Sequence, residues 1–195
     1  SEGTTYHVGD TVTFNITATN IYNEAKTITL SEIEGVTLAK ATFENVVAGG
    51  TIETTATYTI TAADVIAESF KNTVTAAVGD ITKTADATVK TEKVKITITA
   101  ESDEKVYDAN PLTNGGWKKT AGELVNGDTI ASVTVTGSQT LVGSSDNVPS
   151  AAVIKNTAGE EVQTAYDITY TNGKLTVTDD TTEEPVDPSL VTTKV

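Results

Sequence analysis

The stretch that decides the fold is Thr11-Val12-Thr13-Phe14-Asn15-Ile16-Thr17-Ala18-Thr19, where apolar residues stand at even positions and polar residues at odd positions. Side chains of an extended strand point alternately to its two faces, so this pattern predicts a strand with one buried face. The same pattern returns in the first half at Thr27–Leu30, Thr55–Ile60, Thr73–Val78 and Ile81–Val89. Repeated short strands, with turn signals at Gly49-Gly50 and Gly79-Asp80, predict a β-sandwich.

The second half repeats the pattern and is also predicted to be all-β. The expected strands are Val94–Ala100, Ile130–Val135, Ala151–Ile154, Tyr166–Tyr170 and Lys174–Thr178. Asn172-Gly173 is a strong two-residue turn signal, so the last two strands are expected to form a hairpin. The one helical signal is Thr61-Ala62-Ala63-Asp64, where Thr61 and Asp64 have the spacing of a capping box.

These patterns predict two modules in series and an acidic tail. The first module is expected over 1–92 and the second over 93–178, since a new strand begins at Val94 with barely any linker before it. A junction this short predicts a fairly stiff rod. Residues 179–195 begin with an acidic, proline-containing linker. They continue in Leu190-Val191-Thr192-Thr193-Lys194-Val195, a possible first strand of a following repeat.

Composition narrows the function classes. Threonine makes up about a fifth of the 195 residues, a bias toward β-branched side chains that favours strands. The net charge is −14 and every basic residue is a lysine, so nucleic acid and a bare anionic membrane are not expected as partners. There is no cysteine, which excludes disulfides and thiol chemistry. No apolar run is long enough to span a membrane, and we expect export and anchoring signals to lie outside this sequence.

Each half carries residues that resemble a family of bacterial surface repeats. Tyr6–Phe14 with Asn20, Val47–Gly50, Tyr58–Val65 and Asn72–Ala76 resemble the DUF11-like conserved-repeat β-sandwich domain, with Ala48 where that family has a turn proline. In the second half Lys105–Thr113, Gly137–Thr140, Val142-Gly143 and Tyr166–Val177 are similar to YDG-type, MBG-like repeats of Firmicutes adhesins, with Ala109 in place of the usual glycine.

The resemblance implies two immunoglobulin-like sandwiches and exposure on a Gram-positive cell surface, within a wall-anchored protein of tandem repeats. It carries no catalytic residue set. We therefore expect a non-enzymatic stalk that projects the binding head of an adhesin and contacts neighbouring repeats of its own chain. The alternatives are that this segment itself binds host glycan or matrix protein, or that it is a self-assembling fibre subunit.

The ionisable residues offer few catalytic sites. His7 is the only histidine, so we expect it to be a surface-loop residue rather than part of a triad or a metal pair. Glu32 with Glu34, and Glu160 with Glu161, could be written as acid and base, but solvated charge is the simpler interpretation. No cofactor is expected. Calcium is the one metal considered, with candidate ligands Asp179, Asp180, Glu183 and Glu184.

Three further possibilities are two kinds of side-chain cross-link and a ligand-binding aromatic residue. An isopeptide bond would need a lysine, an asparagine and an acid together in one core, for which Lys105 or Lys174 with Asn110 or Asn156 is conceivable. An ester from threonine to Gln139 or Gln163 cannot be assigned. Trp117 follows Gly115-Gly116, so it is a candidate ligand-binding platform, although we favour burial because the module has few other aromatic residues.

Overall fold

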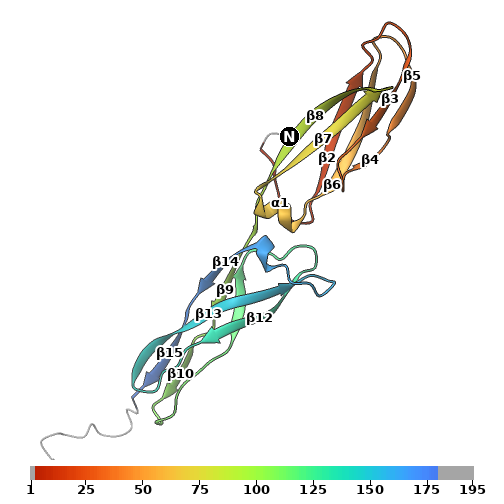
Figure 1. The fold of residues 1–195 in the computed structure, drawn as a ribbon. Coiled ribbons are helices and arrows are strands. Elements are labelled where there is room, and N and C mark those ends of the chain that lie inside the picture. The colour runs from red at the N-terminus through yellow and green to blue at the C-terminus, as the bar shows by residue number, and fades with distance from the viewer. Residues whose placement is uncertain (1–2, 180–195) are drawn as a thin grey trace, which may run out of the picture. The chain divides into compact units, whose positions relative to one another are not determined.

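The computed structural model describes residues 3–179, and almost every element within them is a strand. The all-β prediction with two sandwich modules is confirmed (Figure 1). In the described part, the exceptions are one short α-helix and one turn of 3₁₀ helix. No helix in this range is long and apolar enough to cross a membrane.

The described chain divides into two compact units. The first contains the residues up to Val94 together with Leu124–Asp128 and Asn156–Asp167, and the second contains Lys95–Glu123, Thr129–Lys155 and the residues from Ile168. We call the elements up to β8 the N-terminal module and those from β9 onward the C-terminal module. The predicted limits 1–92 and 93–178 stay a proposal, because two loops of the later half fall within the first unit.

Two sheets form the N-terminal module. The larger has the strand order β1-β8-β7-β3-β5, and the smaller has the order β2-β6-β4. The elements are β1 (Thr5–Tyr6), β2 (Thr11–Thr19), β3 (Lys26–Ser31), β4 (Thr37–Leu38), β5 (Thr42–Val46), β6 (Thr51–Thr59), α1 (Ala62–Ile66), β7 (Ser69–Val78) and β8 (Ile81–Thr91).

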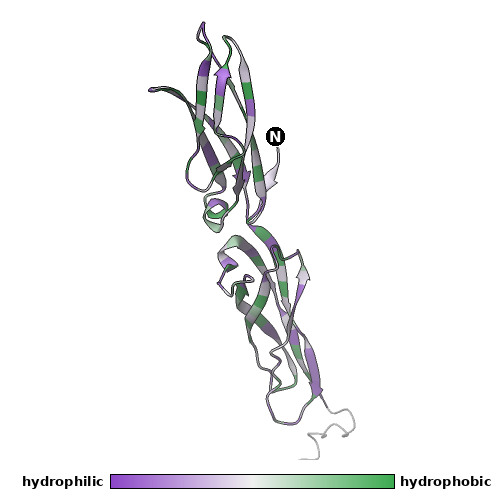
Figure 2. Ribbon diagram, turned by 90° about the vertical axis from the view of Figure 1, so that its right-hand side faces the viewer, coloured by the Kyte–Doolittle hydropathy of each residue, from purple (hydrophilic) through white to green (hydrophobic). Residues whose placement is uncertain are grey.

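The core of this module lies between its sheets, where the predicted rows of apolar residues meet. Val12, Phe14 and Ile16 of β2 are buried, as their even positions predict, and the alternation is visible along the strands in Figure 2. Phe70 of β7 stacks on Tyr58, with ring centroids 3.7 Å apart. Such aromatic contacts add to the stabilisation that area burial alone provides.

Helix α1 confirms the predicted capping box. Thr61 is the N-cap: its hydroxyl accepts from the backbone N–H of Asp64 at 3.3 Å, and the Asp64 carboxylate accepts from the backbone N–H of Thr61 at 2.8 Å. Reciprocal bonds of this kind satisfy two backbone donors that a helix start would otherwise leave free. The helix carries the chain from β6 to β7, which lie in different sheets.

The C-terminal module also has two sheets, with the orders β10-β15-β13-β12 and β11-β9-β14. Buried residues of β9 and β15, such as Ile98 and Leu175, form part of its core. Its elements are β9 (Val94–Ala100), β10 (Asp103–Val106), β11 (Trp117–Ala121), β12 (Thr129–Thr136), β13 (Gly143–Lys155), η1 (Gln163–Ala165), β14 (Tyr166–Thr171) and β15 (Gly173–Thr178).

The predicted hairpin at Asn172-Gly173 is wrong. β14 and β15 lie in different sheets, so Asn172 is the crossing point between them. Gly173 is buried, and a Cβ atom there would stand 2.3 Å from the carbonyl oxygen of Glu101. This glycine therefore permits a close approach of two backbone segments, which is the other common reason for a glycine in a strand.

Candidate functional site

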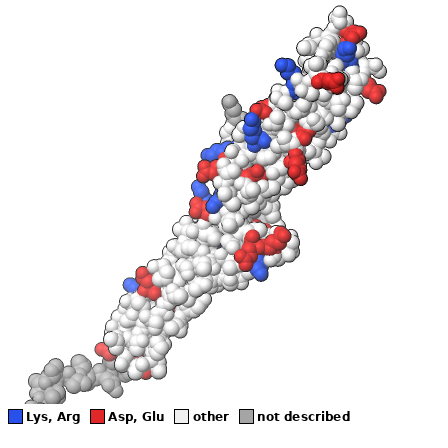
Figure 3. Space-filling view, in the orientation of Figure 1, with Lys and Arg blue, Asp and Glu red and all other residues white. Residues whose placement is uncertain are grey.

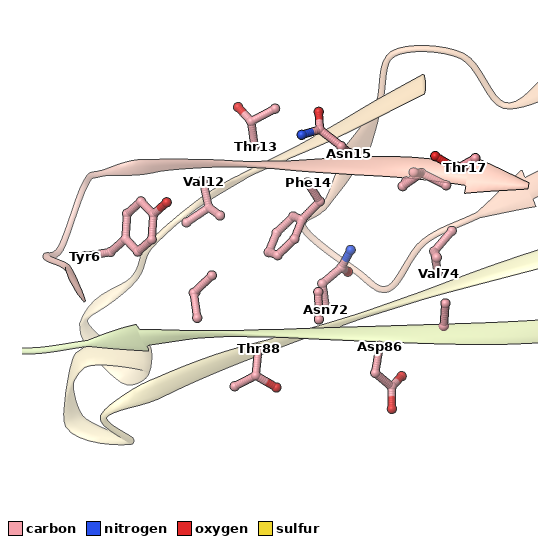
Figure 4. A pocket seen from close by; sticks show the side chains of 14 residues that line it. Tyr6, Val12, Thr13, Phe14, Asn15, Thr17, Asn72, Val74, Asp86 and Thr88 are labelled. Atoms are coloured by element: carbon pink, nitrogen blue, oxygen red, sulfur yellow. The ribbon is translucent and has the colours of Figure 1, made fainter. Parts of the chain in front are cut away.

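The N-terminal module has a groove between its two sheets, along the side where β2 faces β7 and β8. A cavity of about 470 Å³ forms one part of it, lined by residues that include Val12, Phe14, Asn72, Ala85 and Ala87. Figure 4 shows Val12, Phe14 and Asn72 pointing into this space, whereas Thr13 and Asn15 point away from it.

A second cavity, of about 200 Å³, lies beside the far end of β2. Its lining includes Ala18, Ile21, Val78, Ile81 and Lys83. Both cavities have β2 or the residues after it on one side and β7 with β8 on the other. We call the two together the β2–β8 groove.

Unpaired strand edges flank the groove on both sides. Among the described strands, β2 is at the edge of its sheet and has β6 as its one neighbour. β8 pairs with β7 on one side, while on the other side β1 covers only Lys90 and Thr91. The stretch of β8 from Ile81 to Val89 therefore presents free backbone N–H and C=O groups, which can pair with another strand.

The inward face of β8 is also uncovered. Residues directly opposite in an antiparallel pair share a face, so Ala85 and Ala87 of β8 face inward with their partners Val74 and Asn72 of β7. Ala85 and Ala87 are nevertheless exposed, and Ile81 on the same face is 62% exposed. An apolar row that points toward the core but remains exposed is unusual in a packed sandwich.

A partly buried polar pair joins Asn72 of the groove lining to Glu32. Asn72 Nδ2 donates to Glu32 Oε1 at 3.0 Å, while Asn72 Oδ1 and Glu32 Oε2 are buried and have no hydrogen-bond partner among the described residues. The prediction that Glu32 is solvated charge is therefore wrong. Glu32 directly follows β3 and continues its inward row after the buried Ile28 and Leu30, a period-two signal that sequence reasoning missed. Glu34 is exposed.

The other catalytic candidates do not converge on one site. His7 is partly buried, with Nε2 3.4 Å from Glu92 Oε1 and Nδ1 3.7 Å from Asp10 Oδ2. Glu160 accepts from the side chain of Asn156 at 2.9 Å, and Glu161 accepts from Gln163 at 3.1 Å, both on exposed loops. The contacts of Glu160 and Glu161 are local to one loop, whereas His7 joins the residues after β1 to Glu92 after β8.

The calcium candidates gain no support. Asp179 is exposed, and Asp180, Glu183 and Glu184 lie outside the described residues. Between residues 3 and 179, the structure contains no group of three or more side chains suited to hold a metal ion.

The isopeptide candidates are placed on the surface rather than in a core. Lys105 Nζ lies 2.5 Å from Asp108 Oδ1 and donates to the backbone carbonyl of Asn110, not to its side chain, at 2.7 Å. This ion pair lowers the pKa of the Asp108 carboxyl from its usual range. Lys174 is exposed, and the Asn156 side chain is engaged by its own turn. Gln139 donates to the carbonyl of Leu141.

Trp117 takes an intermediate position. It is the first residue of β11, opposite Ala100 of β9, and it is partly buried rather than fully enclosed. The strand pairing holds its backbone, so it is not on the flexible loop that Gly115-Gly116 suggested. Its role in binding stays a prediction.

Charged side chains of both signs are interspersed on one face of the chain (Figure 3). On the face shown in Figure 3, lysines lie beside acidic residues, and Lys71 pairs with Asp86 at 2.6 Å. This contact lowers the pKa of the Asp86 carboxyl from its usual range.

One family model matches part of the second half of the chain. The family model of the MBG domain (YGX type) matches residues 96–176, most of the C-terminal module. This supports the MBG-like resemblance of that half, whereas the DUF11-like assignment of the first half stays a prediction. No curated protein matches the sequence.

Among solved structures, an endo-fucoidan hydrolase of glycoside hydrolase family 107 shows a distant likeness. The alignment has 10% sequence identity and a TM-score of 0.28, and it covers 86% of this chain. The chain spans 26% of that protein's length. A TM-score this low does not define a shared fold, and no chemistry follows for this chain.

Proposed function

We propose that the chain is a stalk or spacer segment of a bacterial cell-surface adhesin, outside the cell and anchored to the wall through other regions of a longer protein. The observation that carries this is the MBG match over 96–176, because MBG domains are non-catalytic repeat modules of surface proteins. Neighbouring repeats of the same chain are then its normal contacts.

The construction of the modules supports a mechanical role. Each core is built from packed strands without cysteine, so the modules do not depend on a redox state. Only Glu92 and Lys93 separate β8 from β9, which leaves little free chain between the modules. In a stalk, such modules transmit force through their sheets and extend the binding head away from the cell surface, without catalysing a reaction.

Force spectroscopy tests the stalk proposal. A chain tethered at its two ends should unfold in two steps, each releasing about 30 nm of extended chain, since about 90 residues extend by roughly 3.3–3.6 Å each. Each unfolding step should appear as a separate peak in the force–extension curve. Extension without any peak would argue against a force-transmitting role.

An adhesive role is the second candidate, because the partly exposed indole of Trp117 lies next to Lys118 and Lys119. Binding to a mixed array of host glycans and matrix proteins tests it, with calcium and with chelator. Saturable binding that Trp117→Ala abolishes and Tyr107→Ala preserves would make the segment an adhesin. Tyr107 is the matched control because it is an exposed aromatic of the same module. A lack of binding under every condition would argue against the adhesive role and would be consistent with the stalk proposal.

A further inference from the structure

The β2–β8 groove has the form of a site for one additional strand. Within residues 3–179 no strand pairs with the outer edge of β2 or with most of the outer edge of β8, and the β2 wall from Val12 to Thr19 is eight residues long. Strands rise about 3.3 Å per residue, so the groove accommodates a strand of ordinary length. A strand placed there would cover Ala85, Ala87 and Ile81.

Two observations indicate how such a strand would bind. β1 already pairs with the end of β8, in parallel, through Thr5 with Lys90 and Tyr6 with Thr91. An inserted strand can extend that pairing along the free edge. The unpartnered Oδ1 atom of Asn72, which is 3% exposed, lies in the same space and can accept one hydrogen bond from the incoming strand.

The chain contains a segment with the required chemistry outside the described residues. Leu190-Val191-Thr192-Thr193-Lys194-Val195 is rich in β-branched residues and has no acidic side chain. The residues before it, 179–187, carry five acids, whereas the groove has Lys83 in its lining and Lys90 at the β1 end. Asp86, which also lines the groove, is paired with Lys71. This charge complementarity favours approach of the acidic linker to the groove.

We propose that the β2–β8 groove is a strand-acceptor site, and that it binds the Leu190–Val195 segment of a second copy of this chain. The incoming segment adds a strand to the free edge of β8 and covers its apolar inward face, a mode of recognition known as β-strand addition. Because donor and acceptor are different surfaces, the contact is heterologous and joins successive copies in a row.

Two matched variants of β8 test the acceptor. Ala85→Lys with Ala87→Lys places charge on the inward face, and Thr84→Lys with Thr88→Lys places the same charge on the opposite face of the same strand. All four positions are exposed, so both variants should fold. Lysine is chosen because it cannot repel the acidic linker.

Sedimentation velocity over a concentration series gives the readout. The chain of 20.3 kDa should associate into larger species as its concentration rises. The inward variant should weaken association by at least about tenfold, since a buried unpaired charge is strongly unfavourable, while the outward variant should associate like the parent. Deleting residues 190–195 should also abolish association. A chain that stays monomeric, equal behaviour of the two variants, or association that survives the deletion would each overturn the proposal.

Cysteine trapping identifies the donor copy, because the natural chain has no cysteine. Ala85→Cys and Thr193→Cys chains, mixed and oxidised, should form a disulfide-linked heterodimer, whereas Thr84→Cys should not pair with Thr193→Cys. A chain that carries both Ala85→Cys and Thr193→Cys tests the alternative that a chain fills its own groove. If this double variant forms an internal disulfide, seen as a fast-migrating monomer, and the mixture of single variants gives no heterodimer, the assignment to a second copy is overturned.

Discussion

Buried asparagines hold loops to strands in both modules. Asn20 is 1% exposed, and its Nδ2 donates to the carbonyls of Glu24 and Val46, each at 2.8 Å, and of Val47 at 3.1 Å. Asn147 is completely buried, and its Nδ2 donates to the carbonyls of Glu101 and Asn114. These carbonyls belong to loops, except that of Val46, which ends β5, so a single amide replaces hydrogen bonds that a strand ladder would supply.

Asn20→Ala should therefore destabilise the N-terminal module by about 2 kcal/mol, since it leaves buried acceptors without a donor. Urea unfolding monitored by circular dichroism measures the loss. Asn23→Ala is the matched control, because Asn23 lies exposed in the same loop, and it should change stability little. Equal effects of the two variants would contradict the role given to Asn20.

The Tyr166–Asp128 pair predicts a pH dependence of stability. Tyr166 donates to Asp128 Oδ2 at 2.6 Å, and burial, reinforced by this bond, raises the pKa of the phenol to about 12. The stabilisation is complete below about pH 10, where an unfolded tyrosine also keeps its proton. Between about pH 10 and 12 the unfolded chain loses its proton first, so stability falls as the pH rises.

Tyr166→Phe should remove part of that fall and also lower stability at pH 8 by about 1–3 kcal/mol, because the buried Asp128 loses its donor. Urea midpoints between pH 8 and 11 measure both effects. Tyr107→Phe, at an exposed position, is the control. An unchanged pH slope in Tyr166→Phe would show that other groups cause the dependence.

At the scale of elements, the capping of α1 rests mainly on one carboxylate. Asp64 Oδ2 accepts from the Thr61 backbone N–H, from the Thr61 hydroxyl at 2.6 Å and from the Tyr58 hydroxyl at 2.9 Å. Asp64→Ala should cost about 1–2 kcal/mol in unfolding free energy, as lost caps commonly do. Asp80→Ala, in the exposed turn between β7 and β8, is the control for a changed charge. A loss in both variants, measured by urea unfolding, would point to net charge instead.

Sequence patterns predicted the elements correctly where residues close together in sequence determine the structure. The even-numbered row of β2 and the Thr61–Asp64 capping box are set by neighbours in sequence, and both are confirmed. The predicted Asn172-Gly173 turn was wrong because a glycine is required at 173 by the close backbone of Glu101, which is far away in sequence. Local residue types cannot report such a contact.

The β2–β8 groove could not be predicted from the sequence for a related reason. Alternation in β8 predicts a buried face, and that face does point inward, but whether another strand covers it depends on sheet order. Glu32 differs, since its even position after Ile28 and Leu30 signals an inward side chain. Its partner Asn72 is 40 residues further along the chain.

At the scale of the whole molecule, two separate cores predict two separate unfolding events. A cooperative unit needs a contiguous core, and the buried side chains of each module pack between its own pair of sheets. Differential scanning calorimetry should therefore resolve two transitions. Asn20→Ala should lower one midpoint and Asn147→Ala, in the second unit, the other, each by about 4–8 °C for every kcal/mol lost in a domain of this size.

The expressed fragment 93–178 gives the matched control for this assignment. It should show one transition, and Asn147→Ala should lower its midpoint as much as in the whole chain, because Asn147 bonds to Glu101 and Asn114 within the fragment. A single transition of the whole chain, shifted by both variants, would show that the modules unfold together. Coupled unfolding would also make the stalk resist force as one unit, so calorimetry and force spectroscopy must agree on the number of steps.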